Sequence, residues 1–193
     1  MSTVPKRRAD AVRNRAAALA AADRLFGDAS DPDEVTMADI ARAAGIGKGT
    51  LFGHFSDRTG LVLALVSQRT AGLREEILAG PPPLGPGAPA AERVPALLAA
   101  LLDFKLANGP LMLTLEREGS SSPYLNAAYG LWHGELTALL TEARGPEHAA
   151  YLAHALLASI RSDLILHATE HDAMSAERLH AGVQELCRSV LAR

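Results

Sequence analysis

The chain has 193 residues and a formal net charge of −3, and 48% of its residues are hydrophobic while only 4% are aromatic. Its single cysteine, Cys187, excludes an intrachain disulfide framework and a zinc site built from several cysteines. We find no secretory leader and no apolar run of the roughly 18–20 residues that a membrane span needs, so we expect a cytoplasmic protein without membrane association.

Alanine and leucine dominate the apolar residues, and both are strong helix formers. Apolar residues recur with a helical period along almost the whole chain, and no strand pattern stands out. The sequence therefore predicts an all-α fold of about nine helices, near residues 10–26, 37–44, 47–53, 57–79, 91–108, 110–117, 123–144, 147–170 and 175–190.

The N-terminus is locally basic although the chain as a whole is acidic. The first 60 residues carry nine Lys and Arg against eight Asp and Glu, and the basic ones gather near the start at Lys6, Arg7, Arg8, Arg13 and Arg15. Local clustering decides whether phosphate is attracted, because the charge of the whole chain is averaged over distant surfaces. We expect residues 1–9 to form a basic, flexible arm.

Two short helices are predicted to follow the first one. Thr36 can cap the helix 37–44, with Asp39 placed to satisfy free N–H groups of the first turn. Gly45 can take the left-handed conformation that closes this helix, and a second helix begins near Gly47.

The pattern of large and small residues indicates that these two helices cross closely. Apolar residues that would fill the space between them and the first helix are Ile40, Ile46 and Leu51. That arrangement puts Lys48, Thr50 and His54 on the outer surface of the second helix, where they can enter a DNA major groove. A helical hairpin without a DNA role has the same pattern and stays an alternative at this point.

The same segment resembles the DNA-binding signature of TetR-family repressors. The matching residues are Ile40-Ala41, Ala44-Gly45, Gly49-Thr50-Leu51-Phe52 and His54-Phe55, and the resemblance covers about residues 10–65. It implies an all-helical homodimer with a helix-turn-helix domain over 10–56 and a helical ligand-binding and dimerisation domain over 57–193. It also implies a repressor that a small molecule releases from double-stranded operator DNA.

The resemblance assigns roles to eight residues of the N-terminal region. Lys48 and Thr50 would contact phosphate or base edges, and Thr36 and His54 would contact phosphate. The remaining members of the set are Arg7 and Arg8, which would reach the backbone or minor groove, and Gly47 and Phe52. The chain departs from the family where Phe52 replaces the usual tyrosine and where Gly47 and Gly53 replace larger residues.

The last two predicted helices are the candidates for the homodimer interface that a palindromic operator requires. Their apolar stripes contain Leu156, Ile160, Leu164, Leu179, Val183, Leu186 and Val190. These stripes can instead be buried against their own chain, and both arrangements can hold together.

A small-molecule site is expected among the middle helices, where most large side chains of the second half occur. Its predicted residues are Phe104, Met112, Leu115, Tyr129, Trp132 and His133. Possible polar groups of this site are Glu116, Arg117, Arg161 and Asp163. The sequence does not identify the ligand, and no cofactor is expected.

Two other functions compete with DNA binding. His167-Ala-Thr-Glu-His171 matches the H-x-x-E-H pattern of inverted zinc peptidases, so a metal-dependent hydrolase is one alternative. Such a site needs a third ligand, and with only 22 residues remaining we expect no catalytic residue and no catalytic metal. Opportunistic metal binding by the pair and plain exposure at the end of a helix both stay open. A protein-interaction module that uses the proline-rich stretch 81–89 is the other alternative.

Overall fold

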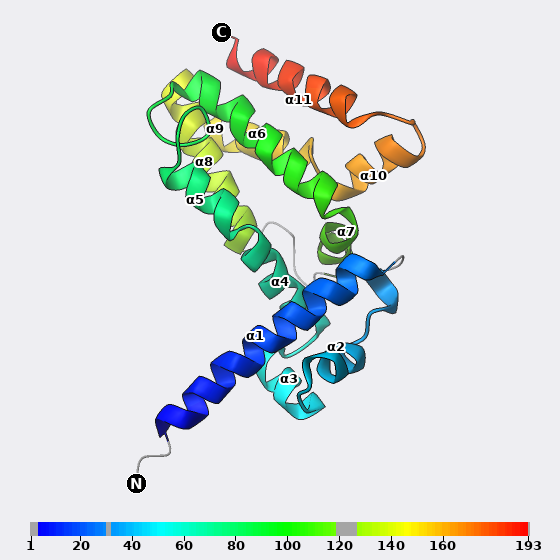
Figure 1. Ribbon diagram of the computed structural model, residues 1–193. Coiled ribbons are helices and arrows are strands. Elements are labelled where there is room, and N and C mark those ends of the chain that lie inside the picture. The colour runs from blue at the N-terminus through cyan, green and yellow to red at the C-terminus, as the bar shows by residue number, and fades with distance from the viewer. Residues whose placement is uncertain (1–3, 30–31, 119–126, 193) are drawn as a thin grey trace. The chain divides into compact units, whose positions relative to one another are not determined.

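The computed structural model describes residues 4–29, 32–118 and 127–192, and over these residues it is all-α, without a strand (Figure 1). The chain divides into two compact units, Met1–Arg69 and Thr70–Arg193. The first unit contains α1 (Val4–Asp28), the 3-10 helix η1 (Pro32–Glu34), α2 (Met37–Ala44), α3 (Lys48–Phe55) and α4 (Arg58–Arg69). The second contains α5 (Ala71–Ala79), α6 (Ala90–Ala107), α7 (Gly109–Glu118), α8 (Ala127–Arg144), α9 (Ala149–Ala158), α10 (Ser162–Glu170) and α11 (Ala176–Leu191).

The all-α prediction is confirmed, but two of the nine predicted helices are each divided into two. The helix expected over 57–79 breaks at Thr70, whose side chain is buried, and forms α4 and α5. The helix expected over 147–170 breaks at 159–161 and forms α9 and α10, because Arg161 is extended with ψ of 144°. Residues 123–126 of another predicted helix lie outside the described part of the chain.

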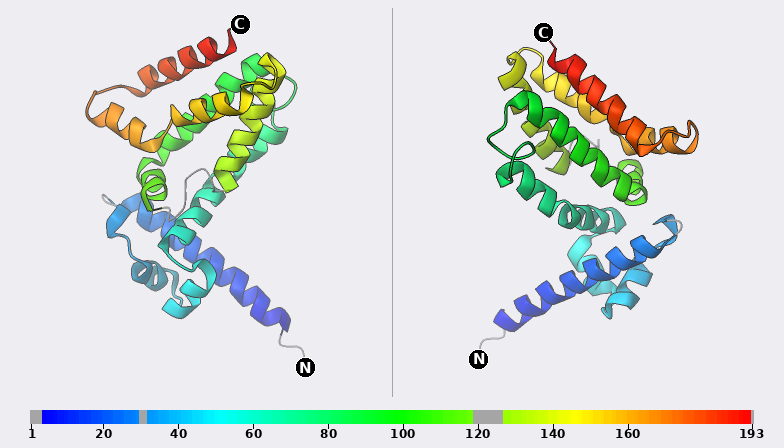
Figure 2. Two further views of the ribbon diagram at one scale, coloured as in Figure 1. Left: turned by 180° about the vertical axis from the view of Figure 1, so that it is seen from behind. Right: turned by 45° about the horizontal axis from the view of Figure 1, so that its top comes forward.

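The first helix is longer than predicted, because α1 begins at Val4 and residues 4–9 are helical where a flexible arm was expected. Arginine and alanine are good helix formers, and a helix already nucleated by packing extends readily into such residues. Among the described side chains, the first buried one is Ala18, so the N-terminal half of α1 carries no core residue. Figure 2 shows this half projecting beyond α2 and α3.

The core of the first unit forms where α1 packs against α2, α3 and α4. Its buried side chains are Ala18, Leu19, Ala21, Ala22, Phe26, Val35, Ile40, Ala41, Leu51, Phe55, Leu61, Val62, Leu65 and Val66. Alanines on α1 let α2 approach closely, and the leucines of α3 and α4 fill the remaining space. The expected roles of Ile40 and Leu51 as buried contacts are confirmed, while Ile46 is half-buried.

Arginines at the two ends of α4 tie this helix to the rest of the first unit. Arg58 donates hydrogen bonds to the carbonyl oxygens of Pro32 (2.7 Å) and Val35 (3.2 Å), just before α2. Arg69 donates to the Asp23 carboxylate of α1 over 2.7 Å. Because hydrogen bonds at both of its ends join α4 to other elements of the first unit, this helix is part of that unit.

The second unit is built around α6, which packs on α8 and α11, while α8 and α9 form an antiparallel pair (Figures 1 and 2). Arg93 of α6 is largely buried and binds the Glu135 carboxylate of α8 over 2.9 Å. It also donates to the carbonyl oxygens of Ile77 and Leu84. The proline-rich connection is therefore anchored to α6 at Leu84.

One stretch, Ala149–Glu170, has the length and mean hydropathy (1.3) of a membrane span, contrary to the sequence prediction that no run reaches that length. In the structure this stretch is two helices, α9 and α10, separated by the non-helical Arg161. Several of its apolar side chains, including Leu156 and Ile160, are fully buried in the core of the second unit.

Candidate nucleic-acid interface

The helix α2 begins with the capping arrangement that its sequence predicts. The hydroxyl oxygen of Thr36 accepts a hydrogen bond from the Asp39 N–H, and the Asp39 carboxylate accepts one from the Thr36 N–H. The Thr36 hydroxyl also donates to the same carboxylate. These bonds, together with Arg42, lower the pKa of Asp39 below its ordinary value. The Thr36 side chain is thus already engaged, which makes it a poorer phosphate donor than predicted.

Gly45 closes α2 in the left-handed conformation, with φ of 66°, and its N–H donates to carbonyl oxygens of the last turn. Two residues later Gly47 is extended and precedes the first residue of α3. This tight turn joins α2 to α3, and the two helices pack against each other.

The helix α3 has one buried and one exposed side. Leu51 and Phe55 point into the core, with exposed fractions of 0% and 5%. Lys48 and Thr50 are exposed, and Phe52 has 47% of its surface exposed, which is unusual for a phenylalanine. Core packing therefore holds α3 so that its polar residues and Phe52 face solvent. His54 is only half-buried and lies edge-on to Phe55.

The start of α3 is suited to an anion. No side chain caps it at Gly47, so the first backbone N–H groups of the helix are free to bind another acceptor. The positive end of the helix dipole adds to this, and Lys48 adds a full charge beside it. A phosphate group of a nucleic-acid backbone fits these three features.

A line of basic residues continues from α3 along α1. The Arg15 guanidinium lies 5.2 Å from the centre of the Phe55 ring of α3. Arg8 lies two turns before Arg15 on the same face of α1 and is exposed. Between them lies Val12, an apolar residue that is 65% exposed. Arg7 is exposed beside it, whereas Arg13 pairs with Asp10. Arg15 was predicted to belong to the basic cluster, but no contact was predicted for it.

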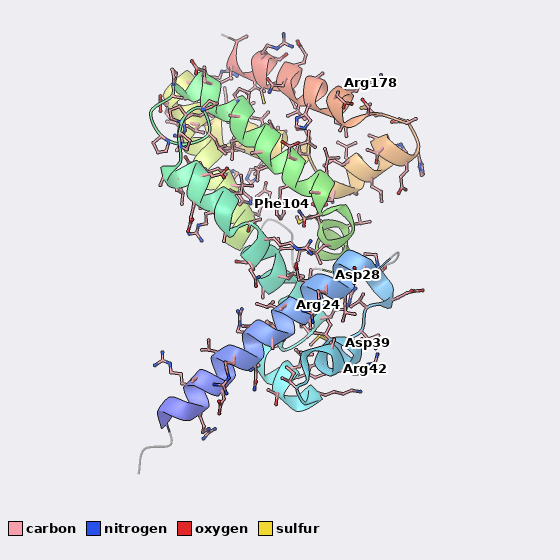
Figure 3. All side chains as sticks on the ribbon, in the orientation of Figure 1. Arg24, Asp28, Asp39, Arg42, Phe104 and Arg178 are labelled. Carbon is pink, nitrogen blue, oxygen red and sulfur yellow. The ribbon has the colours of Figure 1, made fainter. Side chains whose placement is uncertain are left out.

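On α2, Asp39 and Arg42 form an ion pair at the surface, where Figure 3 labels both side chains. Arg42 is 80% exposed in this pair. Such an exposed pair contributes little to stability, so Arg42 is a suitable reference for the buried arginines of this unit.

Three of the predicted dimer residues are buried in their own chain. Leu156, Ile160 and Val183 are 0%, 1% and 8% exposed in the core of the second unit, so they offer a partner almost no surface. Of the others, Leu164 is 48% exposed, and the partly buried ones are Leu179, Leu186 and Val190. The alternative prediction, that these stripes are buried within their own chain, is confirmed for Leu156, Ile160 and Val183.

The predicted ligand residues come from three helices. Phe104, labelled in Figure 3, is on α6 and half-buried, while Met112 and Leu115 are on α7, which packs against α6. Trp132 of α8 is 9% exposed and belongs to the main core.

Tyr129 and His133 of α8 lie beside His154 of α9, a residue that was not among the predicted ligand residues. The His133 and His154 rings are stacked with centres 3.8 Å apart, and the Tyr129 hydroxyl lies 2.6 Å from Nδ1 of His154. His133 also contacts the Ala150 carbonyl oxygen over 3.0 Å. Burial, and then the nearby charge of His133, lower the pKa of His154. The one signal in the sequence that could have indicated His154 is that it lies on an otherwise apolar helix.

Glu116, one of the possible polar groups of the ligand site, joins three helices of the second unit. Its carboxylate accepts hydrogen bonds from Lys105 of α6 (2.9 Å) and from the backbone N–H (3.0 Å) and hydroxyl (2.9 Å) of Ser162. Only 12% of the Glu116 side chain is exposed. This carboxylate therefore supplies the cap of α10 that the local sequence lacks.

Arg161 and Asp163 pair with each other at the surface, and the Arg117 side chain lies outside the described residues.

The two histidines of the H-x-x-E-H pattern lie together at the end of α10. Their ring centres are 4.8 Å apart, and both residues are exposed. Within the described part of the chain, no group of three His, Cys, Asp or Glu residues is arranged to hold a metal ion. A zinc peptidase site built on this pair would lack its third protein ligand there.

Comparisons with known proteins point to bacterial transcriptional regulators. Residues 18–65 match the profile of the bacterial regulatory proteins of the tetR family. Over 120 residues the chain is 30% identical to an HTH-type transcriptional regulator of Staphylococcus aureus, and the match spans 61% of this chain and 61% of that protein. The chain thus aligns with less than two thirds of the length of this curated relative.

The fold is similar to two crystal structures of regulators from Rhodococcus. A TetR transcriptional regulator superimposes with a TM-score of 0.63 at 18% identity, covering 91% of this chain and 96% of that one. A second protein, described as a TetR-family regulator, gives a TM-score of 0.62 at 21% identity and covers 96% of this chain and 100% of that one. At these identities the likeness shows the shared fold.

Proposed function

We propose that the chain is a cytoplasmic transcriptional regulator of the tetR type that binds double-stranded operator DNA as a homodimer, a proposal supported by the match of residues 18–65 to the tetR-family profile. It acts as a repressor, and a small molecule bound in the second unit releases it from the operator.

The observation that carries the proposal is the exposed side of α3. Lys48, Thr50 and Phe52 face solvent, while Leu51 and Phe55 fix the helix on the core. A helix mounted in this way can enter a major groove with its first turn against the phosphates. The free N–H groups at Gly47 favour the same orientation.

The helical start of α1 supports phosphate contacts in preference to minor-groove contacts for Arg7 and Arg8. An α-helix with side chains is about 10–12 Å across, whereas the minor groove of B-DNA is about 6 Å wide. A helix that extends to Val4 does not fit this groove, so Arg7, Arg8 and Arg15 bind the backbone alongside α3. Such contacts raise affinity for any sequence and position the protein on the duplex.

The structure of α4 supports a specific route for the ligand signal. Arg58 and Arg69 hold α4 on the first unit, and the helix ends before Thr70. A displacement of α5 therefore reaches the DNA-binding residues by moving the first unit as a whole. The change that releases DNA is a change in the separation of the two α3 helices of the dimer, which must match successive major grooves roughly 34–36 Å apart.

The test begins with the DNA itself, because the operator sequence is unknown. Untagged full-length protein is used to enrich duplexes from a random pool, and the enriched sequence is expected to be palindromic. Affinity for that duplex is then measured by fluorescence anisotropy for the wild type, Lys48→Ala and the control Arg178→Ala on α11, a residue labelled in Figure 3.

We expect Lys48→Ala to weaken binding at least tenfold, since a base or phosphate contact contributes about 1–3 kcal/mol and the dimer has two copies. Its thermal unfolding should match the wild type, because Lys48 is exposed. Arg178→Ala removes the same charge and should leave affinity unchanged. Equal affinity of the wild type and Lys48→Ala, or the absence of any enriched sequence, would refute the proposal.

A further inference from the structure

The last turn of α10 and the residue directly after the helix carry two histidines whose side chains form no hydrogen bond or ion pair with another described residue. His167 and His171 are four residues apart, so their side chains stand on the same face, one above the other. Both are exposed, and their ring centres are 4.8 Å apart with 56° between the ring planes.

The distance between the ring centres is compatible with two imidazoles that share a metal ion. A metal–nitrogen bond to histidine is about 2.0–2.1 Å, and the ring centre lies roughly 1.1 Å beyond the nitrogen. Coordination angles between about 90° and 110° then place the two ring centres about 4.5–5.2 Å apart. The observed 4.8 Å falls inside this interval without any movement of the backbone.

The backbone that holds the pair is already formed. The His171 N–H donates to the His167 carbonyl oxygen over 2.9 Å, which completes the helical turn between the two rings. Two residues later Ala173 has φ of 49°, a left-handed conformation that costs energy for a residue with a side chain. An ion held by both rings would lock the turn directly before this strained residue.

We propose that His167 and His171 form a surface site for one divalent transition-metal ion, with water molecules as the other ligands. Neutral imidazole favours Cu²⁺, Ni²⁺ and Zn²⁺, whereas Mg²⁺ and Ca²⁺ require oxygen ligands. Protons compete with the metal for the ring nitrogens, so affinity falls as the pH is lowered. The site is independent of the DNA-binding function and needs no third protein ligand.

The test is a calorimetric titration of the untagged full-length protein with NiCl₂, CuCl₂ and MgCl₂. We expect one equivalent of Cu²⁺ and of Ni²⁺ to bind, Cu²⁺ more tightly in accordance with the usual order of affinities, and no heat from Mg²⁺. His167→Asn and His171→Asn should each weaken Ni²⁺ binding at least tenfold. The control is His148→Asn, which removes an exposed histidine that has no histidine one turn away, and this variant should bind as the wild type does.

Electron paramagnetic resonance of the Cu²⁺ complex provides a readout that does not depend on affinity. Two coordinated imidazoles give nitrogen hyperfine splitting that either single variant should change to that of one imidazole or abolish. Far-UV circular dichroism checks that the variants are folded. The proposal is overturned if no saturable Ni²⁺ binding occurs, or if the His171→Asn and His148→Asn variants have the same affinity and the same Cu²⁺ spectrum.

Discussion

Replacing Arg58 by methionine tests whether this residue fixes the geometry of the helix-turn-helix. Arg58 has 19% of its side chain exposed and donates to the carbonyl oxygens of Pro32 and Val35. Methionine keeps an apolar side chain but removes both bonds, together with the guanidinium that lies 5.5 Å from the centre of the Phe26 ring. The 2.7 Å bond from a charged group is worth about 1.5–3 kcal/mol, and the 3.2 Å bond about 0.5–1.5 kcal/mol. The pair with Asp33, a residue that is 65% exposed, adds little.

We therefore expect Arg58→Met to lower the free energy of unfolding by about 2–4 kcal/mol. Urea unfolding followed by far-UV circular dichroism measures this loss. Trp132 and all three tyrosines follow residue 70, so tryptophan fluorescence reports the second unit separately. The matched control is Arg42→Met, which removes an 80% exposed arginine and should change stability by less than about 1 kcal/mol. The reasoning fails if the two variants are equally stable.

Two further predictions concern charge. Replacing Arg7 and Arg8 together by glutamine should reduce the slope of log affinity against log salt by up to about 3.6, since each phosphate contact contributes about 0.9 and the two protomers supply four such contacts. An unchanged slope in anisotropy titrations would show that neither residue binds the backbone. Partial burial, and then the charge of His133, lower the pKa of His154 below its ordinary value of 6.5. The unfolded chain therefore takes up the proton first, and the free energy of unfolding falls as the pH drops below 6.5, until the lower folded-state pKa is reached. His154→Gln should flatten this part of the curve in urea unfolding at several pH values, and a slope equal to that of the wild type would contradict the assignment.

The parts of the fold that local sequence controls could be predicted. Thr36 with Asp39, and Gly45 two turns later, fix both ends of α2 through bonds between near neighbours. The burial of Leu51 and the exposure of Lys48 follow from the helical period of α3. These features depend on residues less than ten positions apart, so the local sequence is enough to predict them.

The two helix breaks could not be predicted, because distant residues cause or stabilise them. No glycine or proline marks Arg161, and α10 begins there because Glu116, 46 positions away, accepts the free N–H of Ser162. The stack of His133 and His154 likewise forms only when α8 and α9 pack together. For the same reason the apolar stripe with Leu156 and Ile160 did not reveal that it is buried in its own chain.

The glycines of α3 have a practical consequence for protein engineering. A Cβ atom added at Gly49 or Gly53 would have no neighbour within 4 Å, and one at Gly47 would meet only the Thr50 hydroxyl at 3.8 Å. Each glycine inside a helix costs about 0.5–1 kcal/mol relative to alanine. Arginine, asparagine or glutamine can therefore be introduced at Gly49 and Gly53 to select new base pairs without disturbing packed atoms. Given the proposed DNA-binding function, such substitutions would retarget the protein to another DNA sequence without lowering its stability.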